Sequence, residues 1–432
     1  MTHLKKSGIK VVLFFYDIRN TGLPESLRRE FESDQVVVES VRSVSSGRFY
    51  RKFSFFNSLF AYNKARRRRR YIIRGWSKTL LFFEQLLFGF LNKLHFLKTF
   101  ARYLEGNFFV DNFYAVYFDK YKPDVVFSTS IISKLDIDFL KEAKKRKIKT
   151  VAMPKVWDNI THVLYKVIPD KLILQNDLMK EGAINYQRIK NPEIISVCGF
   201  PQFDWYRRKD VLMSREDYFK SIGLDPNKKL ILWGSSGVFT PDDAHIPKIL
   251  VEAIKSGKIL NGAVSLLIRA HFTDAKDKRF DCFKGIENVQ IDDNLALSEF
   301  FHDRCDPRED EIKRFVNMIY HSDVVVCLCS TLTLDAFCVD KPVVNTVFKS
   351  LYDKNGKDIS HILYEWDHYE PIIKEKAVDM VYSEEEFFKG LNDCLQYPER
   401  KKEARQRVLD TLCYKVDGQS SKRIANEILE ML

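Results

Sequence analysis

The sequence lacks the short motifs by which several large enzyme classes are recognised. No two of its 17 glycines are separated by a single residue, so the G-x-G-x-x-G turn that holds a dinucleotide pyrophosphate occurs nowhere. The chain also contains no G-x-x-x-x-G-K-[ST] phosphate loop, no H-E-x-x-H zinc motif and no G-x-S-x-G nucleophile elbow. These absences disfavour NAD and FAD enzymes, phosphate-loop ATPases, metalloproteases and ordinary esterases.

Long hydrophobic runs and paired cysteines are missing as well. The most apolar window, residues 80–91, is interrupted by Glu84 and is shorter than the roughly 18 residues that span a bilayer. The eight cysteines form no C-x-x-C pair and no cluster with histidine at zinc-ligand spacing. The first residues lead into an apolar strand without a small-residue cleavage site. We therefore expect a cytoplasmic protein with reduced core thiols, no secretion signal and no membrane-spanning helix.

The positive charge is concentrated in one stretch. The chain carries 70 Lys and Arg against 59 Asp and Glu, a net charge of +11. Residues 48–105 contain 14 basic and 2 acidic residues, so the rest of the chain is close to neutral. The same stretch holds 16 aromatic residues. This composition favours a partner that is both anionic and partly apolar, a membrane surface before a nucleic acid.

Within this stretch a run of five arginines is followed by aromatic and leucine residues. An arginine run alone is usually a solvated face or a nucleic-acid patch. Arginine on one face with Trp, Phe and Leu on the other is typical of a helix that lies among lipid headgroups, although part of the apolar face can be ordinary core. The residues expected to dock on the membrane are Arg66, Arg67, Arg68, Arg69, Arg70, Trp76, Phe82 and Phe83.

Apolar runs and helix-like segments alternate along the chain. A first series of runs occupies residues 11–16, 125–128, 150–153, 172–174 and 194–197, and a second series occupies residues 230–234, 266–270, 289–291, 324–328 and 342–347. Continuous apolar runs predict strands buried on both faces, as in parallel sheets covered by helices. We therefore predict an α/β protein of two Rossmann-like domains facing a cleft: residues 1–203, with the insertion at about 48–105, and residues 204–432.

In open parallel sheets, ligands bind beyond the carboxyl ends of the strands. In the second domain three such ends carry polar residues suited to a diphosphate. They are a small hydroxyl-bearing turn at 234–237, whose free N–H groups would approach a phosphate closely, a cation beside an imidazole, and two hydroxyls at a helix start. These residues are Gly234, Ser235, Ser236, Arg269, His271, Ser330, Thr331 and Asp335. Each also has an ordinary interpretation: a tight turn, a hydrogen-bonded histidine or a helix cap. Their joint placement favours a nucleotide-diphosphate site.

The tract HSDVVVCLCSTLTLDAFCVDKPVV at residues 321–344 resembles the donor-site signature of bacterial GT-B glycosyltransferases. Arg269-Ala-His271 resembles the Arg-Pro-His stretch of the branch that includes CDP-glycerol glycerophosphotransferases, with Ala270 in place of the proline. Trp157-Asp-Asn159, the GFPQFD sequence at 199–204 and the DGQSSKRI sequence at 417–424 are also similar to that branch. The resemblance extends from about residue 124 to the end.

The resemblance implies that the C-terminal domain holds a nucleotide-activated donor and the N-terminal domain the acceptor, with the last helix returning towards the N-terminal domain. Ser330 and Thr331 would face the diphosphate, Asp335 the ribose or donor sugar, and Arg269 with His271 the phosphates. GT-B enzymes usually work without a metal, so we expect no metal and no cofactor, and charge and helix dipoles would stabilise the leaving diphosphate.

An inverting transfer needs a general base near the acceptor hydroxyl. The candidates are Asp17 after the first strand, Asp158 in the Trp-Asp-Asn turn and His162 four residues later. We favour Asp158, because a carboxylate beside a Trp in a cleft is placed for a raised pKa, although the turn can also be purely structural.

These observations predict a peripheral membrane enzyme on the inner face of the plasma membrane. It would be a GT-B glycosyltransferase that moves a sugar from a nucleotide-diphosphate donor to a membrane-proximal or lipid-linked glycan acceptor, in bacterial surface polysaccharide synthesis. Glycerophosphotransferase-type transfer of a polyol phosphate and sugar-nucleotide 2-epimerisation are the enzymatic alternatives. A nucleic-acid-binding protein that uses the arginine run is the alternative from another class, although we expect no nucleic-acid partner.

Overall fold

The computed structural model describes residues 2–17, 20–42, 47–59, 77–109, 112–157, 159–237, 240–274, 278–293, 297 and 308–432. The chain divides into two compact units. The first unit comprises residues 1–200, 412–414 and 419–432, and the second comprises residues 201–411 and 415–418. The division therefore falls three residues before the predicted one, and the end of the chain belongs to the first unit.

The first unit contains two parallel sheets. β1 (Val11–Asp17) pairs with β2 (Val36–Arg42), and a second sheet has the order β3-β4-β5-β6. The strands of the second sheet are β3 (Val125–Ser128), β4 (Lys149–Ala152), β5 (Lys171–Leu174) and β6 (Ile195–Val197). Every paired neighbour runs parallel, as the continuous apolar runs predict.

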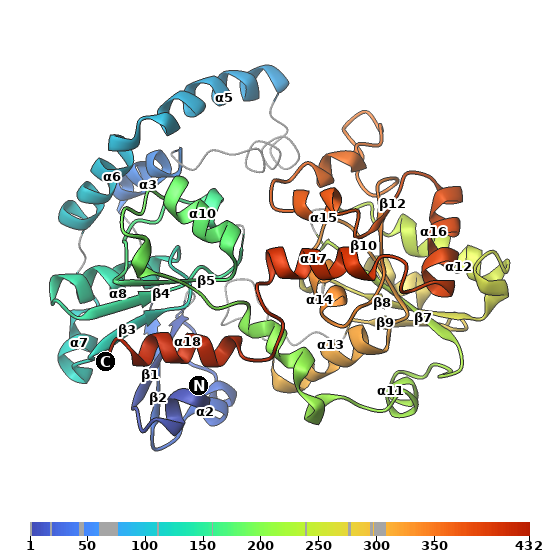
Figure 1. The fold of residues 1–432 in the computed structure, drawn as a ribbon, viewed down its shortest axis with the longest axis horizontal. Helices are drawn as coiled ribbons and strands as arrows, with labels where there is room; N and C mark the ends of the chain where they lie inside the picture. The colour runs from blue at the N-terminus through green and yellow to red at the C-terminus, as the bar shows by residue number, and fades with distance from the viewer. Residues whose placement is uncertain are drawn as a thin grey trace. The chain divides into compact units, whose positions relative to one another are not determined.

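Helices surround these sheets (Figure 1). They are α1 (Thr2–Lys6), α2 (Glu25–Phe31), α3 (Arg48–Leu59), α5 (Lys78–Lys93), α6 (His95–Phe108), α7 (Ala115–Tyr121), α8 (Lys134–Lys145), α9 (Asn159–His162), α10 (Asp177–Asn185) and α18 (Ser420–Leu429). α18 packs Ile424 and Ile428 into the core cluster of Val151 and Ile173. The last helix thus completes the first unit, as the sequence predicts.

The second unit is built on one six-stranded parallel sheet with the order β12-β11-β10-β7-β8-β9. Its strands are β7 (Lys229–Gly234), β8 (Val264–Arg269), β9 (Val289–Asp292), β10 (Val324–Cys327), β11 (Val343–Thr346) and β12 (Asp379–Val381). Its α-helices are α11 (Arg215–Ile222), α12 (His245–Lys255), α13 (Glu309–His321), α14 (Leu332–Cys338), α15 (Glu370–Lys374), α16 (Glu384–Gln396) and α17 (Lys402–Leu412). Short 3-10 helices connect them, among them η2 (Pro201–Arg207), η6 (Phe272–Asp274), η7 (Lys278–Phe283) and η8 (Ser360–Tyr364).

The core of the second unit lies against the sheet. α12 and α16 pack Ile246, Leu250, Phe387 and Leu391 onto the strands. α13 and α14 contact β7 and β10. Because helices pack along this sheet, the strand ends and the loops that follow them are the places where a ligand can bind.

Ten of the twelve strands coincide with predicted apolar runs to within two or three residues at each end. The sequence pattern misses β2, where Glu39 and Ser40 interrupt the apolar run, and β12, which has only three residues. β2 is held in place by its pairing with β1, and that pairing is not visible in a local pattern.

Candidate nucleotide site

The polar segments that the sequence singles out meet at one edge of the second sheet. β7 has β10 on one side and β8 on the other, and all three strands run parallel. The chain crosses from β9 back to β10, so the strand order reverses between β7 and β10. The segments at 234–237, 269–271 and 329–331 therefore follow three adjacent strands at a topological switch point. Such a fork is where open α/β sheets bind ligands.

Two glycines allow these segments to approach closely. A Cβ on Gly234 would lie 2.4 Å from Cδ2 of Leu332, so a side chain there would displace the start of α14. Gly237 has a φ of +66°, and a Cβ on it would lie 2.1 Å from Thr273 Oγ1 and 2.6 Å from His271 Nδ1. The glycines thus bring the backbone of the Gly-Ser-Ser-Gly turn against both neighbouring segments.

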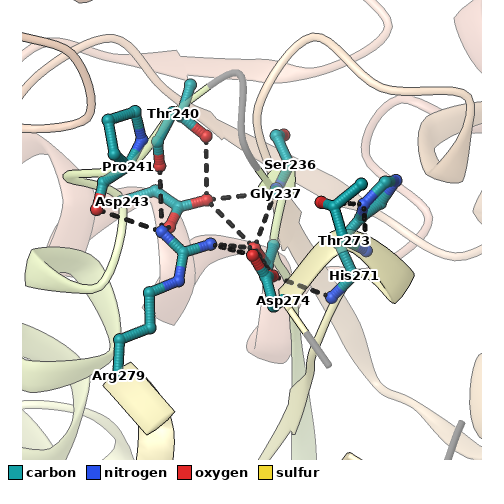
Figure 2. Close-up of polar contacts among 10 residues, drawn as sticks. Ser236, Gly237, Thr240, Pro241, Asp243, His271, Thr273, Asp274 and Arg279 are labelled. Carbon is teal, nitrogen blue, oxygen red and sulfur yellow. Dashed lines mark hydrogen bonds and ion pairs between the residues drawn. The ribbon is translucent and has the colours of Figure 1, made fainter. Parts of the chain in front are cut away.

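A network of ion pairs and hydrogen bonds around Arg279 holds this turn in place (Figure 2). Arg279 Nη2 donates to Ser235 Oγ at 2.8 Å and to Asp274 Oδ1 at 2.7 Å, and its Nη1 lies 3.1 Å from Asp243 Oδ1. Asp243 Oδ2 accepts hydrogen bonds from the backbone N–H of Ser236 at 3.0 Å and from Thr240 Oγ1 at 2.9 Å. One guanidinium thereby joins the loops after β7 and β8.

The backbone N–H groups of the turn already have hydrogen-bond acceptors within the protein. Ser235 N–H donates to the carbonyl of Arg269, Ser236 N–H to Asp243, and Gly237 N–H to Ser235 Oγ, each at 3.0 Å. The sequence interpretation of free N–H groups that cradle a phosphate is therefore wrong for these three residues. The Ser236 hydroxyl remains: it is buried and has no hydrogen-bond partner among the described residues. Figure 2 shows it pointing away from Arg279.

His271 lies at the rim of the same network. Its backbone N–H donates to Asp274 Oδ2 at 3.0 Å, and its Nδ1 lies 2.7 Å from Thr273 Oγ1. Burial lowers the pKa of His271, although the Asp274 carboxylate opposes that shift. Burial raises the pKa of Asp243 to about 6, and the Arg279 charge limits the rise. The imidazole is therefore mainly neutral at pH 7, and it gains a proton most readily when an anion binds beside it.

Arg269 is placed differently from the sequence expectation. Its Nη1 forms an ion pair with Asp292, and its Nη2 lies 3.3 Å from Glu311 Oε1. The Arg269 side chain is 17% exposed, and these two carboxylates balance its charge. In this structure Arg269 ties β8 to β9 and α13, and a phosphate would have to compete with both carboxylates for it.

Ser330 and Thr331 lie where the sequence places them, at the start of α14. Ser330 is half-buried, and its Oγ accepts a hydrogen bond at 3.2 Å from the backbone N–H of Leu332, the first residue of α14. Thr331 is exposed. Asp335 is half-buried, and its Oδ1 accepts a hydrogen bond from the Tyr206 hydroxyl at 2.9 Å. Burial raises the pKa of Asp335 to about 7, against the opposing effect of this hydrogen bond.

The structure adds four residues that sequence reasoning missed. Asp243 and Asp274 are buried around the turn, Arg279 lies between them and is 12% exposed, and Tyr206 is buried against Asp335. A hint for Asp274 was its place three residues after His271, still within the strand-end loop. Arg279 lies in η7, beyond the residues that directly follow β8, and Tyr206 reaches Asp335 from η2, 129 residues earlier in the chain, so neither carries a local signal.

The three candidate bases belong to the first unit. Asp17 is buried, and its carboxylate accepts hydrogen bonds from the backbone N–H groups of Thr21 at 3.0 Å and Gly22 at 2.8 Å. It therefore acts as an anchor for the loop after β1. Asp158 lies outside the described residues. His162 ends α9, and its side chain is likewise outside the described part of the chain.

The expected membrane-docking residues are described only in part. Arg66 to Arg70 and Trp76 lie outside the described residues. Phe82 and Phe83 lie on α5 and are exposed. Among the described residues there is no group of three or more His, Cys, Asp or Glu side chains placed to hold a metal ion.

A cavity of about 340 Å³ lies beside α15 in the second unit. Its lining residues are Tyr364, Glu365, Trp366, Asp367, Glu370, Ile373 and Lys374. The Tyr364 hydroxyl donates to the carbonyl of Thr346, the last residue of β11, so this cavity opens near the carboxyl end of the strand beside β10.

Several solved structures align with nearly the whole chain. A UDP-N-acetylglucosamine 2-epimerase aligns at a TM-score of 0.50 and 13% identity, over 98% of this chain and 95% of that chain. A putative UDP-N-acetylglucosamine 2-epimerase from Listeria monocytogenes aligns at a TM-score of 0.50 and 14% identity, over 96% of this chain and 94% of that chain. The protein has the GT-B fold.

A glycosyltransferase from Rickettsia africae ESF-5 aligns at a TM-score of 0.48 and 14% identity, over 99% of this chain and 92% of that chain. No protein-family model and no curated protein sequence matches the chain. At 13% and 14% identity the likeness to the two epimerases shows the fold alone, and the reaction is left to be argued from the site. The expected fold class of two Rossmann-like α/β domains is confirmed.

Proposed function

We propose that this GT-B protein is a glycosyltransferase that moves a sugar from a nucleotide-diphosphate donor to a glycan acceptor in bacterial surface polysaccharide synthesis. The observation that carries the proposal is the meeting of the Ser236 and Ser330 segments at the fork between β7 and β10. The second unit supplies the donor site in this proposal. Hydroxyl donors at a switch point suit a diphosphate, whose oxygens accept several hydrogen bonds at once.

Each hydroxyl has a stated role in the proposal. The buried Ser236 hydroxyl, which has no partner among the described residues, donates to a phosphate oxygen. Thr331 and Ser330 donate from the opposite side of the fork. A hydrogen bond to a charged group contributes about 1.5 to 3 kcal/mol, so three such donors hold a diphosphate without relying on Arg269.

The other two residues of the proposed site handle protons and sugar hydroxyls. His271 lies beside Gly237, and protonation of its imidazole would oppose the negative charge that develops on the leaving diphosphate. Asp335 accepts a hydrogen bond from a ribose or donor-sugar hydroxyl through its second carboxylate oxygen, since Oδ1 already accepts from Tyr206. The Tyr206 contact fixes the direction of that second oxygen.

The acceptor side is proposed from the sequence. A glycan hydroxyl that attacks the donor must lose a proton, and Asp158 remains the preferred base, with His162 as the alternative. Asp17 is a weaker candidate, because both its carboxylate oxygens already accept backbone hydrogen bonds.

A thermal-shift screen across nucleoside diphosphates tests the donor site. Ligand bound only by the folded state stabilises it by about 2.7 kcal/mol at 100 times its dissociation constant, so the correct nucleotide raises the melting temperature. Ser236→Ala and Thr331→Ala should each remove most of that shift. Ser256→Ala, on the C-terminal end of α12, is the matched control and should keep it. A full shift in both site variants, or no shift with any nucleotide, overturns the proposal.

Acceptor-free incubation with the nucleotide sugar separates transfer from epimerisation, since only an epimerase converts the sugar nucleotide alone. Incubation with CDP-glycerol and a polyol-phosphate acceptor tests the glycerophosphotransferase alternative in the same format. Product formation that requires a glycan acceptor and a sugar nucleotide is the expected outcome.

A further inference from the structure

Helix α6 has its charged side chains on the inside. Lys98 is 2% exposed and donates to the carbonyl of Tyr186 at 2.8 Å. Arg102 donates to the carbonyls of Tyr165 and Gln187, both at 2.8 Å. Both cations therefore point into the first unit, where backbone carbonyl oxygens accept their hydrogen bonds.

Glu105 completes the inward face. It is fully buried, accepts hydrogen bonds from Lys141 at 2.5 Å and from the Tyr50 hydroxyl at 2.8 Å, and lies 3.7 Å from Lys166. The contact with Tyr50 joins α6 to α3, and the contact with Lys141 joins it to α8. These bonds fix which face of α6 points outward.

The outward face is aromatic. Phe96, Phe100, Tyr103 and Phe108 recur at helical spacing and are between 54% and 70% exposed. Soluble helices show the reverse pattern, with apolar residues against the core and charges in water. Burial of apolar surface contributes about 25 cal/mol for each Å² removed from water, and the exposed rings of this face do not gain that free energy. The face is therefore suited to an apolar neighbour.

Helix α5, which precedes α6 in the chain, also has an exposed apolar face. Its exposed apolar residues are Leu80, Phe82, Phe83, Leu86, Leu87 and Phe90. Residues 79–91 and 96–108 meet at a bend of 83°. No single helix in the described part of the chain is long and apolar enough to cross a membrane, although this bent pair together meets the length and composition criteria.

The charge around this surface indicates which kind of apolar partner it would bind. Residues 48–105 contain 14 basic and 2 acidic residues. In the described part of this stretch Arg48, Arg51 and Lys52 are exposed on α3, next to Phe49, which is 75% exposed. Cations beside exposed rings match a bilayer with anionic headgroups, where each Lys or Arg near the surface contributes about 1 kcal/mol.

We propose that the outward faces of α5 and α6 insert into the interfacial region of an anionic lipid bilayer, while the exposed cations of α3 bind its headgroups. α6 stays on the protein because Lys98 and Arg102 hold it to backbone carbonyls of the first unit. The protein thus sits on one leaflet. A nucleic acid is a poorer fit, because the cations of α6 itself are turned away from this surface. The inference stands independently of the proposed reaction.

Vesicle co-sedimentation of the full chain tests the surface. Wild-type protein should pellet with vesicles of phosphatidylcholine mixed with phosphatidylglycerol, and less with phosphatidylcholine alone. The double variants Phe83→Ser/Phe90→Ser on α5 and Phe96→Ser/Phe100→Ser on α6 should each lower partitioning by about tenfold or more. Tyr382→Ser/Tyr397→Ser removes two exposed rings of the second unit, 60% and 55% exposed, and should change nothing.

The headgroup contribution has its own variant. Arg51→Gln/Lys52→Gln should remove much of the preference for anionic vesicles and leave binding to neutral vesicles unchanged, because only the Coulombic part is lost. Added salt should weaken wild-type binding in the same direction. Equal loss on both vesicle types contradicts the assignment of these two cations.

Hydrogen exchange of the wild-type protein with and without vesicles supplies a readout that does not depend on whether the variants fold. Lipid should slow amide exchange within residues 78–108 and leave the second unit unchanged. The inference is overturned if wild type fails to pellet with either vesicle, if the α5 and α6 variants pellet like wild type, if the control falls equally, or if RNA protects this segment and lipid does not. Nucleotide thermal shifts on the same preparations report separately on the donor site.

Discussion

The hydroxyl of Tyr206 donates to Oδ1 of Asp335 at 2.9 Å, joining the first segment of the second unit to the helix after β10. Burial raises the pKa of Asp335 to about 7 from an ordinary value of 3.8. The folded state therefore holds a proton that the unfolded chain releases near pH 4. The stability that this proton contributes is complete below that pH and is lost as the pH rises towards 7.

Replacing Tyr206 by Phe should raise the pKa of Asp335 further, because the carboxylate loses its donor. The variant should cost about 1 to 3 kcal/mol at pH 8, where the charge is present, and less at pH 5. Scanning calorimetry at the two pH values measures the difference. Tyr382→Phe, which alters an exposed ring, is the control, and a Tyr206→Phe cost that does not vary with pH contradicts the prediction.

Replacing Arg279 by Met should destabilise the second unit by about 3 to 5 kcal/mol, because Asp243 and Asp274 lose their shared cation. The pKa of Asp243, already raised to about 6 by burial, should rise further. The loss should therefore be larger at pH 8 than at pH 5, where a proton neutralises the carboxylate. Lys278→Met, a change at a neighbouring exposed cation, should cost less than about 0.5 kcal/mol in the same calorimetric measurement.

Gly234→Ala should cost about 1 to 3 kcal/mol, since the new methyl group would lie 2.4 Å from Leu332 Cδ2. It should also weaken nucleotide binding, because the start of α14 carries Ser330. Gly106→Ala is the matched control: it lies in α6 with no atom within 4 Å of the added methyl, and should be neutral or stabilising. Chemical unfolding and the nucleotide thermal shift provide the two measurements. Equal behaviour of the two alanine variants would show that the β7–α14 approach is not tight.

Nucleotide affinity should rise as the pH falls from 8 towards 6, because a bound diphosphate favours the protonated imidazole of His271. Burial lowers the pKa of that imidazole in the free protein, so binding must move it upward. His271→Ala should bind less tightly at low pH and lose the pH dependence. Titration calorimetry across this range measures the slope. His361→Ala, at an exposed histidine of η8, should keep the wild-type slope.

Transfer activity should survive a metal chelator, because the proposed site stabilises the leaving diphosphate with hydroxyls and an imidazole. The expected change in turnover is less than about twofold, with initial rates measured before and after addition of EDTA. A large loss of activity with EDTA that added Mg²⁺ restores would contradict the prediction, because the proposed site includes no metal ligand.

The strand-end rule brought the candidate segments together without a structure. Ser235, His271 and Ser330 each follow a continuous apolar run, and parallel strands place their carboxyl ends on one edge. The resemblance assigned Arg269 to the phosphates, whereas the structure pairs this side chain with two carboxylates. The partners of this side chain, Asp292 and Glu311, come from the next strand and from a helix 42 residues away, which a local pattern does not reveal.

The sequence by itself determined the α/β class, the parallel sheets and the polar segments that meet at one sheet edge, because apolar periodicity and strand-end polarity are local properties. Only the tertiary structure decided how the polar groups are shared. In the folded protein, N–H groups of the Gly-Ser-Ser-Gly turn donate to Asp243 and Ser235, and Arg269 pairs with two carboxylates. The Lys98 and Arg102 side chains of α6 point inward. Such decisions depend on which distant segments are packed together, and burial then sets the energy of each unpaired group.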